Sequence, residues 1–461
     1  MTKANPNHIE KPGYQLTKLG WIPEDWEVTS LEKLVDPQRP ISYGIVQTGK
    51  PVENGIKCIR VIDLVEGQID PSKLITTSQK ISDSYKRTIL QEEDVIIALR
   101  GKIGQLGIVS KDLSGANLTR GVALLAATKV EKNYLKHQLS SPLTKKRLER
   151  NLNGSALKEL SIGVLRKFNI PLPTNGLEQQ KIATILSSWD KAIQKQEALI
   201  AKKQKLKKGL MQQLLTGKLR FPEFVKSTKT KETKLGEIPE DWELLTVSKL
   251  FKFLPTNSFS RAQMNHEYSY DSVFNIHYGD IHATYDHVLL DLDKNDTLVP
   301  VLENDLKYNQ DAYLKDGDLI VADASEDYKG VGDCIELKNV RGRKVLSGLH
   351  TIALRDLTGR TVDGFRAYCL KNSPVAKNLM KLATGSKVYG ISKASISRLE
   401  ILLPSKEEQQ KIASVLIEAD QEIEKLRQQL EELKTQKKGL MQQLLTGQIR
   451  VKTKQYAHET T

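Results

Sequence analysis

Near the end of the chain, apolar residues recur at alternating steps of four and three. They are Ile412, Leu416, Ala419, Ile423, Leu426, Leu430, Leu433, Leu440 and Leu444, with Lys437 as a polar interruption. This spacing predicts a long amphipathic helix with a coiled-coil seam. An earlier segment has the same pattern at Ile182, Leu186, Trp189, Ile193, Ile200, Leu210 and Leu214, interrupted by polar Gln196, Lys203 and Lys207. Since Gly217 and Gly447 follow as natural helix stops, we predict helices over residues 177–217 and 407–447.

The rest of the chain contains short apolar runs that are typical of strands. They are DVIIAL (94–99), GVALLAAT (121–128), DLIVAD (318–323) and HTIALRDL (350–357). Polar, glycine-containing loops separate these runs. We therefore predict an α+β fold class, with two mixed α/β domains at residues 1–176 and 218–406. The order of the strands does not follow from the sequence.

The chain contains two copies of the helix and of the segment before each domain. KLGWIPEDWEV (18–28) returns as KLGEIPEDWEL (234–244), and residues 178–220 align with 408–450 without a gap, identical at 22 of 43 positions. The domains between them differ. Each half of the chain is therefore a variable domain framed by a fixed lead-in and a fixed helix. The lead-ins span residues 18–34 and 234–250, and a tail follows at 448–461.

This internal repeat also predicts how the two helices pack. Repeated units tend to pack with pseudo-twofold symmetry, as the two copies of an isologous dimer do. Because a twofold axis across two helices makes them antiparallel, we predict an antiparallel coiled coil. Each helix has about 40 residues and is therefore roughly 60 Å long. That length is enough to hold two readers one turn of DNA, ~34 Å, apart.

The composition narrows the class of partner. The 461 residues include 70 Lys and Arg against 56 Asp and Glu, a net charge of +14 that favours a polyanion such as DNA. No apolar run is long enough to cross a membrane, and the N-terminus has no apolar signal core. We therefore expect a cytoplasmic protein without a membrane partner. Cys58, Cys334 and Cys369 lie far apart, which argues against disulfides and against a zinc site.

Three motifs resemble catalytic or metal sites only superficially. GIVQTGKP (44–51) has Pro51 where a phosphate-binding loop needs Ser or Thr. The D…E-x-K pattern that begins at Asp318 imitates a nuclease metal site, but such patterns are common by chance. HYGDIHATYDH (277–287) places three histidines five residues apart, a spacing that matches neither a helix face nor a strand face. We expect no catalytic residue, metal or bound cofactor in this chain.

The duplicated IPEDWE lead-in, the duplicated EQQKIA…KKGLMQQLLTG helix and the two unlike domains resemble the specificity subunits of type I restriction–modification enzymes. The resemblance covers nearly the whole chain. It implies two target-recognition domains, each reading half of a split site in double-stranded DNA, and a coiled coil that docks two methyltransferase subunits. It also implies that these partners bring S-adenosylmethionine for adenine methylation. Separate motor–nuclease subunits would bring ATP and Mg²⁺.

The resemblance also nominates residues that lie near DNA. The segments IRVIDLVEGQID, ALRGKIGQLGIV, GANLTRGVALLA, IHYGDIH and TGSKVYGISKASI look like recurrent segments of the family. Arg, Asn and His side chains can contact base edges, whereas Lys usually contacts phosphate. Asp63 and Asp280 occupy matching places, and we expect them to organise loops. The nominated residues are Arg60, Arg100, Lys102, Asn117, Arg120, His277, Tyr278, Lys387 and Tyr389.

Two other interpretations of the sequence stay open. The chain could be a stand-alone nuclease or DNA methyltransferase, but the missing cofactor motifs count against an enzyme. It could also be a coiled-coil scaffold without sequence preference. A scaffold does not explain why two unlike domains are framed by the same repeated segments.

Overall fold

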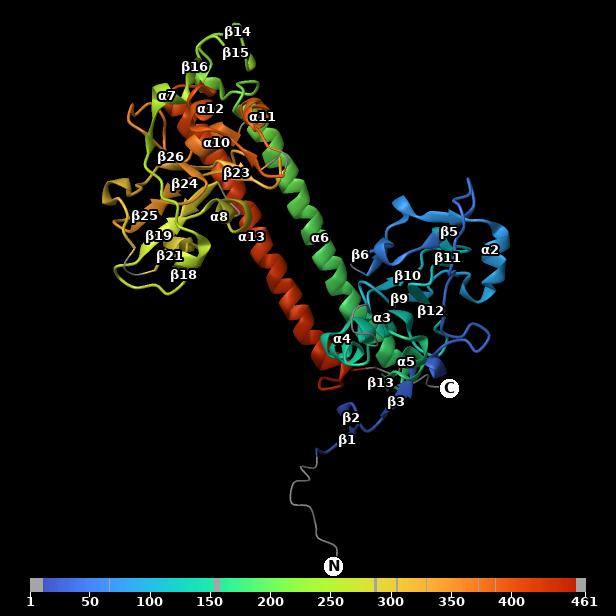
Figure 1. Cartoon of the computed structure of the whole chain (residues 1–461). Coiled ribbons are helices and arrows are strands. Elements are labelled where there is room, and N and C mark those ends of the chain that lie inside the picture. The colour runs from blue at the N-terminus through green and yellow to red at the C-terminus, as the bar shows by residue number, and fades with distance from the viewer. Residues whose placement is uncertain are drawn as a thin grey trace, which may run out of the picture. The chain divides into compact units, whose positions relative to one another are not determined.

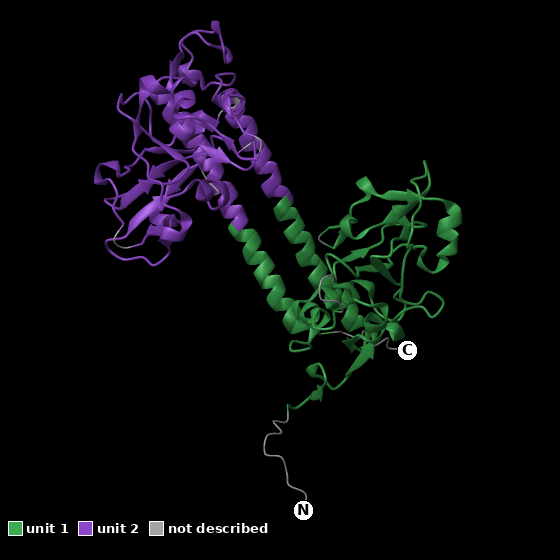
Figure 2. Cartoon of the chain, viewed as in Figure 1, with its two compact units in different colours: residues 1–197, 428–461 green, residues 198–427 purple. Residues whose placement is uncertain are grey.

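The computed structural model of the chain (Figure 1) describes residues 11–65, 67–152, 158–285, 288–303, 306–328, 330–371, 373–385 and 387–452. The chain divides into two compact units (Figure 2). The first unit comprises residues 1–197 and 428–461, and the second comprises residues 198–427. Each unit therefore contains one variable domain, the beginning of one long helix and the end of the other.

The first unit contains a four-stranded antiparallel sheet of order β10-β9-β12-β4 and a three-stranded sheet of order β11-β5-β8. In the smaller sheet, β11 runs parallel to β5. Its strands are β1 Tyr14–Thr17, β2 Gly20–Pro23, β3 Trp26–Ser30, β4 Ser42–Tyr43, β5 Ile56–Ile59, β6 Leu64–Val65, β7 Gln68–Ile69, β8 Ile75–Thr77, β9 Val95–Ala98, β10 Leu106–Ile108, β11 Asn117–Leu118, β12 Val122–Leu125 and β13 Asn169–Pro173. Its short helices are α1 Leu31–Leu34, α2 Gln79–Ser84, α3 Lys132–Ser140, α4 Pro142–Glu149 and α5 Ile162–Lys167.

The second unit contains a five-stranded sheet of order β17-β26-β22-β24-β20 and a four-stranded sheet of order β18-β21-β19-β25. Its strands are β14 Thr230–Thr233, β15 Gly236–Pro239, β16 Glu243–Thr246, β17 Phe251–Leu254, β18 Met264–Asn265, β19 Val273–Ile276, β20 Leu289–Asp291, β21 Val301–Leu302, β22 Leu319–Ala322, β23 Ala324–Ser325, β24 Cys334–Lys338, β25 Lys344–Ser347, β26 Thr351–Asp356, β27 Tyr389–Gly390 and β28 Glu400–Leu403. Its short helices are α7 Val247–Leu250, α8 Tyr278–Ala283, α9 Leu292–Asn295, α10 Arg366–Lys371, α11 Ser373–Leu382 and α12 Lys393–Ser397.

The two units share one backbone path. The order β10-β9-β12-β4 in the first unit matches β24-β22-β26-β17 in the second. The parallel pair β11–β5 matches the parallel pair β25–β19. The second unit adds strands at the edges, including β20 and β18. The predicted α+β class and the internal repeat are confirmed, although the two domains share little sequence.

The two long helices are α6 (Gly176–Leu214) and α13 (Lys406–Leu445). Both end before a glycine in the left-handed region, at φ 72° for Gly217 and 69° for Gly447, as the sequence predicts. Every predicted seam residue is buried or half-buried, and those near the start of each helix also belong to a domain core. The buried set is Ile182, Leu186, Ile200, Leu214, Ile412, Leu416, Ile423, Leu430 and Leu444, and the half-buried set is Trp189, Ile193, Leu210, Ala419, Leu426, Leu433 and Leu440.

Ion pairs show that the helices run antiparallel within each unit. In the first unit, Asp190 pairs with Lys437, and Glu197 pairs with Lys434 at 3.2 Å. As residue numbers rise along α6, those of the partners on α13 fall. The second unit has the same arrangement, with Lys203 pairing with Glu422 and Lys207 with Asp420.

These pairs explain two of the polar interruptions in the seams. Lys437 and Lys207 occupy equivalent places in the two helix copies, and so do their partners Asp190 and Asp420. The same Asp–Lys pair is therefore made twice. A polar pair in an apolar seam favours one register because any other register leaves its charges unpaired.

A junction in the first unit explains why the lead-in and the helix ends are repeated. The Trp26 indole N–H donates to Glu178 at the start of α6 over 3.3 Å. Arg450, just beyond α13, donates to Glu178 over 2.7 Å and to Asp25 over 2.6 Å. Gly447 lies so close to Pro23 that an added Cβ would come within 2.4 Å of the proline ring.

The second unit has the same junction. The Trp242 indole donates to Glu408 at the start of α13 over 3.0 Å, and Arg220 donates to Glu408 and Asp241 over 2.8 Å each. A Cβ on Gly217 would come within 2.5 Å of Pro239. The same junction between a lead-in and a helix end therefore occurs once in each unit.

No helix in the described ranges is both long and apolar enough to cross a membrane.

Candidate nucleic-acid interface

In the first unit, three segments nominated from the sequence meet around Val61. A methyl group added to Gly121 would lie 2.9 Å from Val61 Cγ2, and one on Gly101 would lie 3.7 Å from Val61 Cγ1. The backbone N–H of Leu99 donates to the carbonyl of Gly121 over 2.8 Å. We call residues 60–63, 99–105 and 119–121 the first convergent surface. It holds four of the five residues nominated in this domain.

Arg60 has two roles in this surface. It holds the loop in place, and it offers hydrogen-bond donors. Its guanidinium binds Asp63 over 2.8 Å and the carbonyl of Lys73 over 2.7 Å. The Asp63 carboxylate also accepts the Arg60 backbone N–H over 2.8 Å and is itself buried. Hydrogen bonding to Asp63 raises the pKa of Arg60. The expectation that Asp63 organises a loop is confirmed.

The other cations of the first convergent surface differ in whether they form ion pairs with residues of the chain. Arg100 pairs with Glu159 over 2.8 Å, and both side chains are half exposed. Its Nε is buried and has no hydrogen-bond partner within the described part of the chain. Lys102 and Arg120 are exposed, and neither makes an ion pair with any residue that the structure describes. Of the side chains in this surface, those of Lys102 and Arg120 are therefore the most available to donate hydrogen bonds to a ligand.

Asn117 corrects the prediction made from the sequence. Its side chain is fully buried and accepts a hydrogen bond from Thr88 Oγ over 2.7 Å. It also donates to Ser82 Oγ over 3.0 Å. These bonds consume its polar atoms in a network that joins β11 to α2. Asn117 supports the surface from behind and has no accessible atom for a base.

The second unit gathers three matching segments. The Tyr278 backbone N–H donates to the carbonyl of Leu349 over 3.2 Å, and that of Asp323 donates to the carbonyl of His350 over 3.0 Å. We call residues 277–280, 323–328 and 349–351 the second convergent surface. Its segments occupy the same places in the fold as those of the first.

His277 and Tyr278 lie in the first of these segments. His277 is buried, and its Nδ1 accepts the backbone N–H of Gly279 over 3.2 Å. Burial, and secondarily Arg261, lower the pKa of His277, so the ring stays neutral at pH 7. The half-buried Tyr278 ring packs 4.6 Å from His277 and 5.3 Å from His350.

Lys387 and Tyr389 belong to a neighbouring segment. Strand β27, which contains Tyr389, pairs with β23 in the hairpin of the second convergent surface. The Tyr389 ring lies edge-on to Tyr328 with centroids 5.2 Å apart. Lys387 is exposed beside it. The structure thus places both residues at the edge of the surface rather than at its centre.

Two residues were missed in the sequence, one in this surface and one bound to it. Arg261 binds Asp280 over 2.5 Å and so does for Asp280 what Arg60 does for Asp63. His350 directly precedes β26, in the place that Gly121 has before β12, and it binds Asp323 over 3.2 Å. Aligning the runs GVALL (121–125) and HTIAL (350–354) would have identified His350, which takes the place of Gly121. No sequence signal identifies Arg261, because it lies 19 residues from Asp280.

The motifs that imitate catalytic sites have structural roles. Asp318 is buried and binds Arg355 over 2.6 Å, whereas Glu336 binds Arg366 over 3.2 Å. Burial raises the pKa of Glu336 to about 7, although Arg366 opposes the shift. Within the described residues, no group of three His, Cys, Asp or Glu side chains could hold a metal ion. His287, the last histidine of HYGDIHATYDH, lies outside the described residues.

The comparison with known families then decides the assignment. A sequence model described as "Type I restriction modification DNA specificity domain" matches residues 23–203 and again residues 239–435, which together make up most of the chain. The chain belongs to this family. The two matches reproduce the internal repeat, so each half of the chain is one copy of the specificity domain.

Relatives in the specificity family include proteins from bacteria and archaea. The chain is 35% identical to the type I restriction enzyme EcoBI specificity subunit of Escherichia coli over 161 residues, which is 34% of this chain and 33% of that protein. It is 27% identical to the putative MjaX specificity subunit of Methanocaldococcus jannaschii, over 96% of this chain and 98% of that protein. The similarity to the latter spans both copies of the domain.

Solved structures show the same fold. The chain superposes on the S subunit of a type I restriction–modification system from M. genitalium with a TM-score of 0.53 and 15% identity. That superposition covers 94% of this chain and 99% of the other. A chain from a study of complex assembly and conformational transition of the type I R-M system gives a TM-score of 0.57 at 17% identity, covering 93% and 99%.

Proposed function

We propose that this chain is the DNA-reading subunit of a type I restriction–modification complex and that each unit reads one half of a two-part target. One observation carries the proposal. A single framework is built twice, with the same junction and the same Asp–Lys pair, and it presents two different convergent surfaces. Two unlike surfaces in equivalent places suit the reading of two unlike short sequences.

We further infer that the paired helices set the gap between the half-sites. A helix of about 40 residues is roughly 60 Å long, and readers on one side of a duplex sit about 34 Å apart. The repeated pairs Asp190–Lys437 and Lys207–Asp420 support this role because they favour one register of α6 against α13.

The chain would act in the cytoplasm without catalysis of its own. Methyltransferase subunits would dock on the long helices and bring S-adenosylmethionine. Motor–nuclease subunits would bring ATP and Mg²⁺. The acidic residues that imitate a nuclease site support this division of labour, since Asp318 and Glu336 are buried and bound to arginines.

Exchanging the first domain tests the modular arrangement. Residues 35–176 are replaced by the first domain of another specificity subunit, and methylated adenines are mapped in a host that carries the complex. We expect one half of the target to change and the other half to stay. A change in both halves, or in neither, contradicts the proposal.

A paired insertion tests the spacing. Four residues, about one helical turn, are inserted after Lys203 and four after Glu422, which pair across the two helices. We expect the half-sites to stay the same while the gap between them changes. An unchanged gap would refute the role of the helices as a ruler.

Competition between DNA duplexes tests the scaffold alternative. A specificity subunit should prefer its target over random duplexes by about 10³ or more. Equal binding of the two duplexes would favour a non-specific scaffold.

A further inference from the structure

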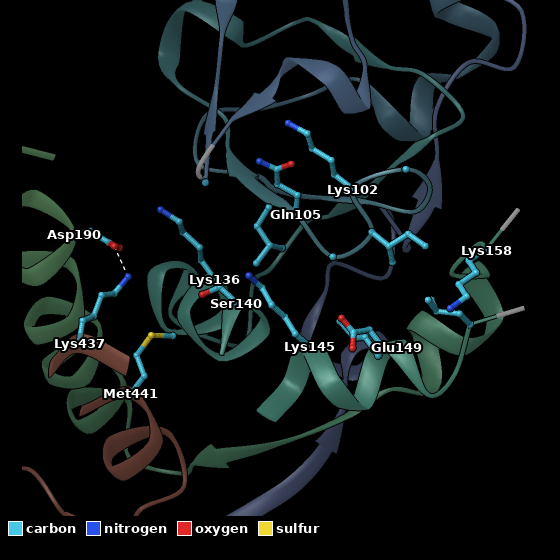
Figure 3. A pocket seen from close by; sticks show the side chains of 17 residues that line it. Lys102, Gln105, Lys136, Ser140, Lys145, Glu149, Lys158, Asp190, Lys437 and Met441 are labelled. Carbon is cyan, nitrogen blue, oxygen red and sulfur yellow. Dashed lines mark hydrogen bonds and ion pairs between the residues drawn. The ribbon is translucent and has the colours of Figure 1, made fainter. Parts of the chain in front are cut away.

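The first unit contains a cavity of about 990 Å³ whose lining is rich in lysine (Figure 3). Its lining comes from the β6–β7 turn, the β9–β10 hairpin, α3, α4, Leu152 and Lys158 beyond α4, and the parts of α6 and α13 that belong to this unit. In Figure 3, Lys136 and Lys145 extend from α3 and α4 toward the side where the hairpin carries Lys102 and Gln105. The lysines of the lining are Lys102, Lys136, Lys145, Lys158 and Lys437.

The lining carries an excess of positive charge. Lys437 is neutralised by Asp190, and Glu149 is the other acidic residue of the lining. The remaining four lysines make no ion pair with any residue in the described ranges. Lys102 and Lys145 are exposed and free to meet a ligand.

Lys136 is the most constrained of these cations. Its side chain is half-buried. Burial lowers its pKa, Asp190 partly offsets that shift, and the like charge of Lys437 lowers the pKa further. An ammonium group withdrawn from water beside another cation, without its own counter-ion, is destabilised. A bound anion at this place would relieve that cost.

The lining also indicates which kind of anion fits. Lysine ammonium groups bind phosphate as point charges. None of the lining residues is aromatic. Nucleotides and single strands are held largely by stacking on aromatic rings, so this cavity is poorly suited to a free base. The phosphates of a duplex need no such ring.

We propose that this lysine-lined cavity binds the phosphate backbone of duplex DNA beside the half-site read by the first unit. The inference rests on the proposed function, because Lys102 belongs to both the cavity and the first convergent surface. The cavity would add affinity that is independent of sequence and would position the first convergent surface on the groove.

The salt dependence of binding tests this proposal. The dissociation constant of the full chain for a random duplex is measured from 50 to 200 mM salt. The variants are Lys102→Gln/Lys145→Gln and the triple variant that adds Lys136→Gln. For each phosphate that a variant no longer neutralises, the slope of log K against log salt should fall by about 0.9, or about 2.7 for all three lysines. Lys33→Gln, an exposed lysine on α1 outside the cavity, serves as the matched control and should leave the slope unchanged.

A variant of opposite charge sharpens the test. Glu149→Gln removes an anion from the lining, so it should raise the affinity for random duplexes. The double variant Lys102→Gln/Lys145→Gln alters only exposed side chains and keeps the test interpretable if Lys136→Gln disturbs folding. An unchanged salt slope in the double variant, or weaker binding by Glu149→Gln, overturns the proposal.

The outcomes separate this proposal from the proposed function. If the wild-type chain prefers its target but the double variant keeps the wild-type slope, only the cavity proposal fails. If the wild-type chain has no sequence preference, the proposed function fails. Loss of co-elution with modification subunits at an unchanged DNA slope would identify the cavity as a protein-docking site and also overturn the proposal.

Discussion

The two convergent surfaces follow the same backbone path but carry different chemistry. Arg60 in the first unit stands where His277 stands in the second, and Arg120 and Gly121 stand where Leu349 and His350 stand. The hairpin of the first surface contains Arg100 and Lys102. The matching hairpin of the second contains Asp323, Glu326 and Asp327. The first surface is therefore basic where the second is partly acidic.

The residues that support these surfaces are alike in the two units. Asp63 and Asp280 both accept the backbone N–H of the residue three positions earlier, and an arginine binds each of them. Asp94 and Asp318, each just before a central strand, bind Arg39 and Arg355. The framework is thus repeated in detail while the surface varies. Framework and surface can change independently.

The two units should differ most in how much stability they lose when the arginine of the junction is removed. Arg220 is 7% exposed and Arg450 is 42% exposed, although each binds a buried glutamate. Arg220→Ala leaves Glu408 buried without a cation, and we expect a loss of about 3–5 kcal/mol in the stability of the second unit. Arg450→Ala should cost less because water reaches the site around Arg450.

Hydrogen exchange resolved by peptide measures this difference in each unit. Arg398→Ala, at an exposed arginine of the second unit, is the control. Equal losses of stability for Arg220→Ala and Arg450→Ala would break the comparison.

The next difference is the response to acid. In the first unit, His137 is buried against Ser187 and Asp190, and burial lowers its pKa to about 4. The folded state therefore binds fewer protons than the unfolded state between pH 6.5 and pH 4. The stability due to neutral His137 is complete above about pH 6.5 and is lost as the pH falls toward about 4, up to about 3 kcal/mol.

In the second unit, the corresponding contact to the Asp–Lys pair is made by Tyr368, whose hydroxyl donates to Asp420 over 2.5 Å. This phenol stays neutral in acid. Hydrogen exchange at pH 7 and pH 4.5 should show the first unit losing more stability than the second, and His137→Gln should remove most of the excess. The same acid response in wild type and variant would contradict this account.

A smaller difference should appear in DNA recognition. Arg120→Gln should weaken discrimination at the half-site of the first unit by about 1–3 kcal/mol, because an arginine can bind guanine through two hydrogen bonds. His350→Gln should alter only the other half-site. Binding to duplexes with single-base changes in each half measures both effects. A change in the same half for both variants would show that the units do not read separately.

The smallest difference between the two units should be in the coupling energies of their Asp–Lys pairs. Double-mutant cycles with alanine at Asp190 and Lys437, and at Lys207 and Asp420, should give coupling energies of about 1–2 kcal/mol. The pair with Asp420 should be the stronger because Tyr368 also donates to it. Coupling near zero in both cycles would show that these pairs do not fix the register.

The sequence predicted those parts of the fold that depend on local periodicity or on repetition. The seam from Ile412 to Leu444 follows from a spacing of four and three, and the helix stops follow from Gly217 and Gly447. The junctions could not be predicted in the same way. Arg450 and Glu178 lie 272 residues apart and have no shared pattern that would pair them.

The candidate nucleic-acid interface could be predicted only in part, because it too depends on contacts between distant parts of the sequence. Residue type does not determine exposure, so Asn117 looked like a base reader but is buried. Glycine contacts near Val61 bring three distant segments together, and no spacing in the sequence encodes that meeting. The remaining nominated residues stay predictions until DNA binding is measured.

The first unit is made of two segments that lie far apart in the sequence, residues 1–197 and 428–461. Its core includes Met441, Leu444 and Leu445, and the Tyr14 hydroxyl donates to the carbonyl of Gly447 over 3.0 Å. The second unit, in contrast, is one continuous segment that ends at residue 427. At about 5–20 residues per second, the ribosome needs roughly 10–50 s to proceed from the start of α6 to these last core residues. The domain that is translated first therefore waits for the last turn of α13 to be translated before its core can close.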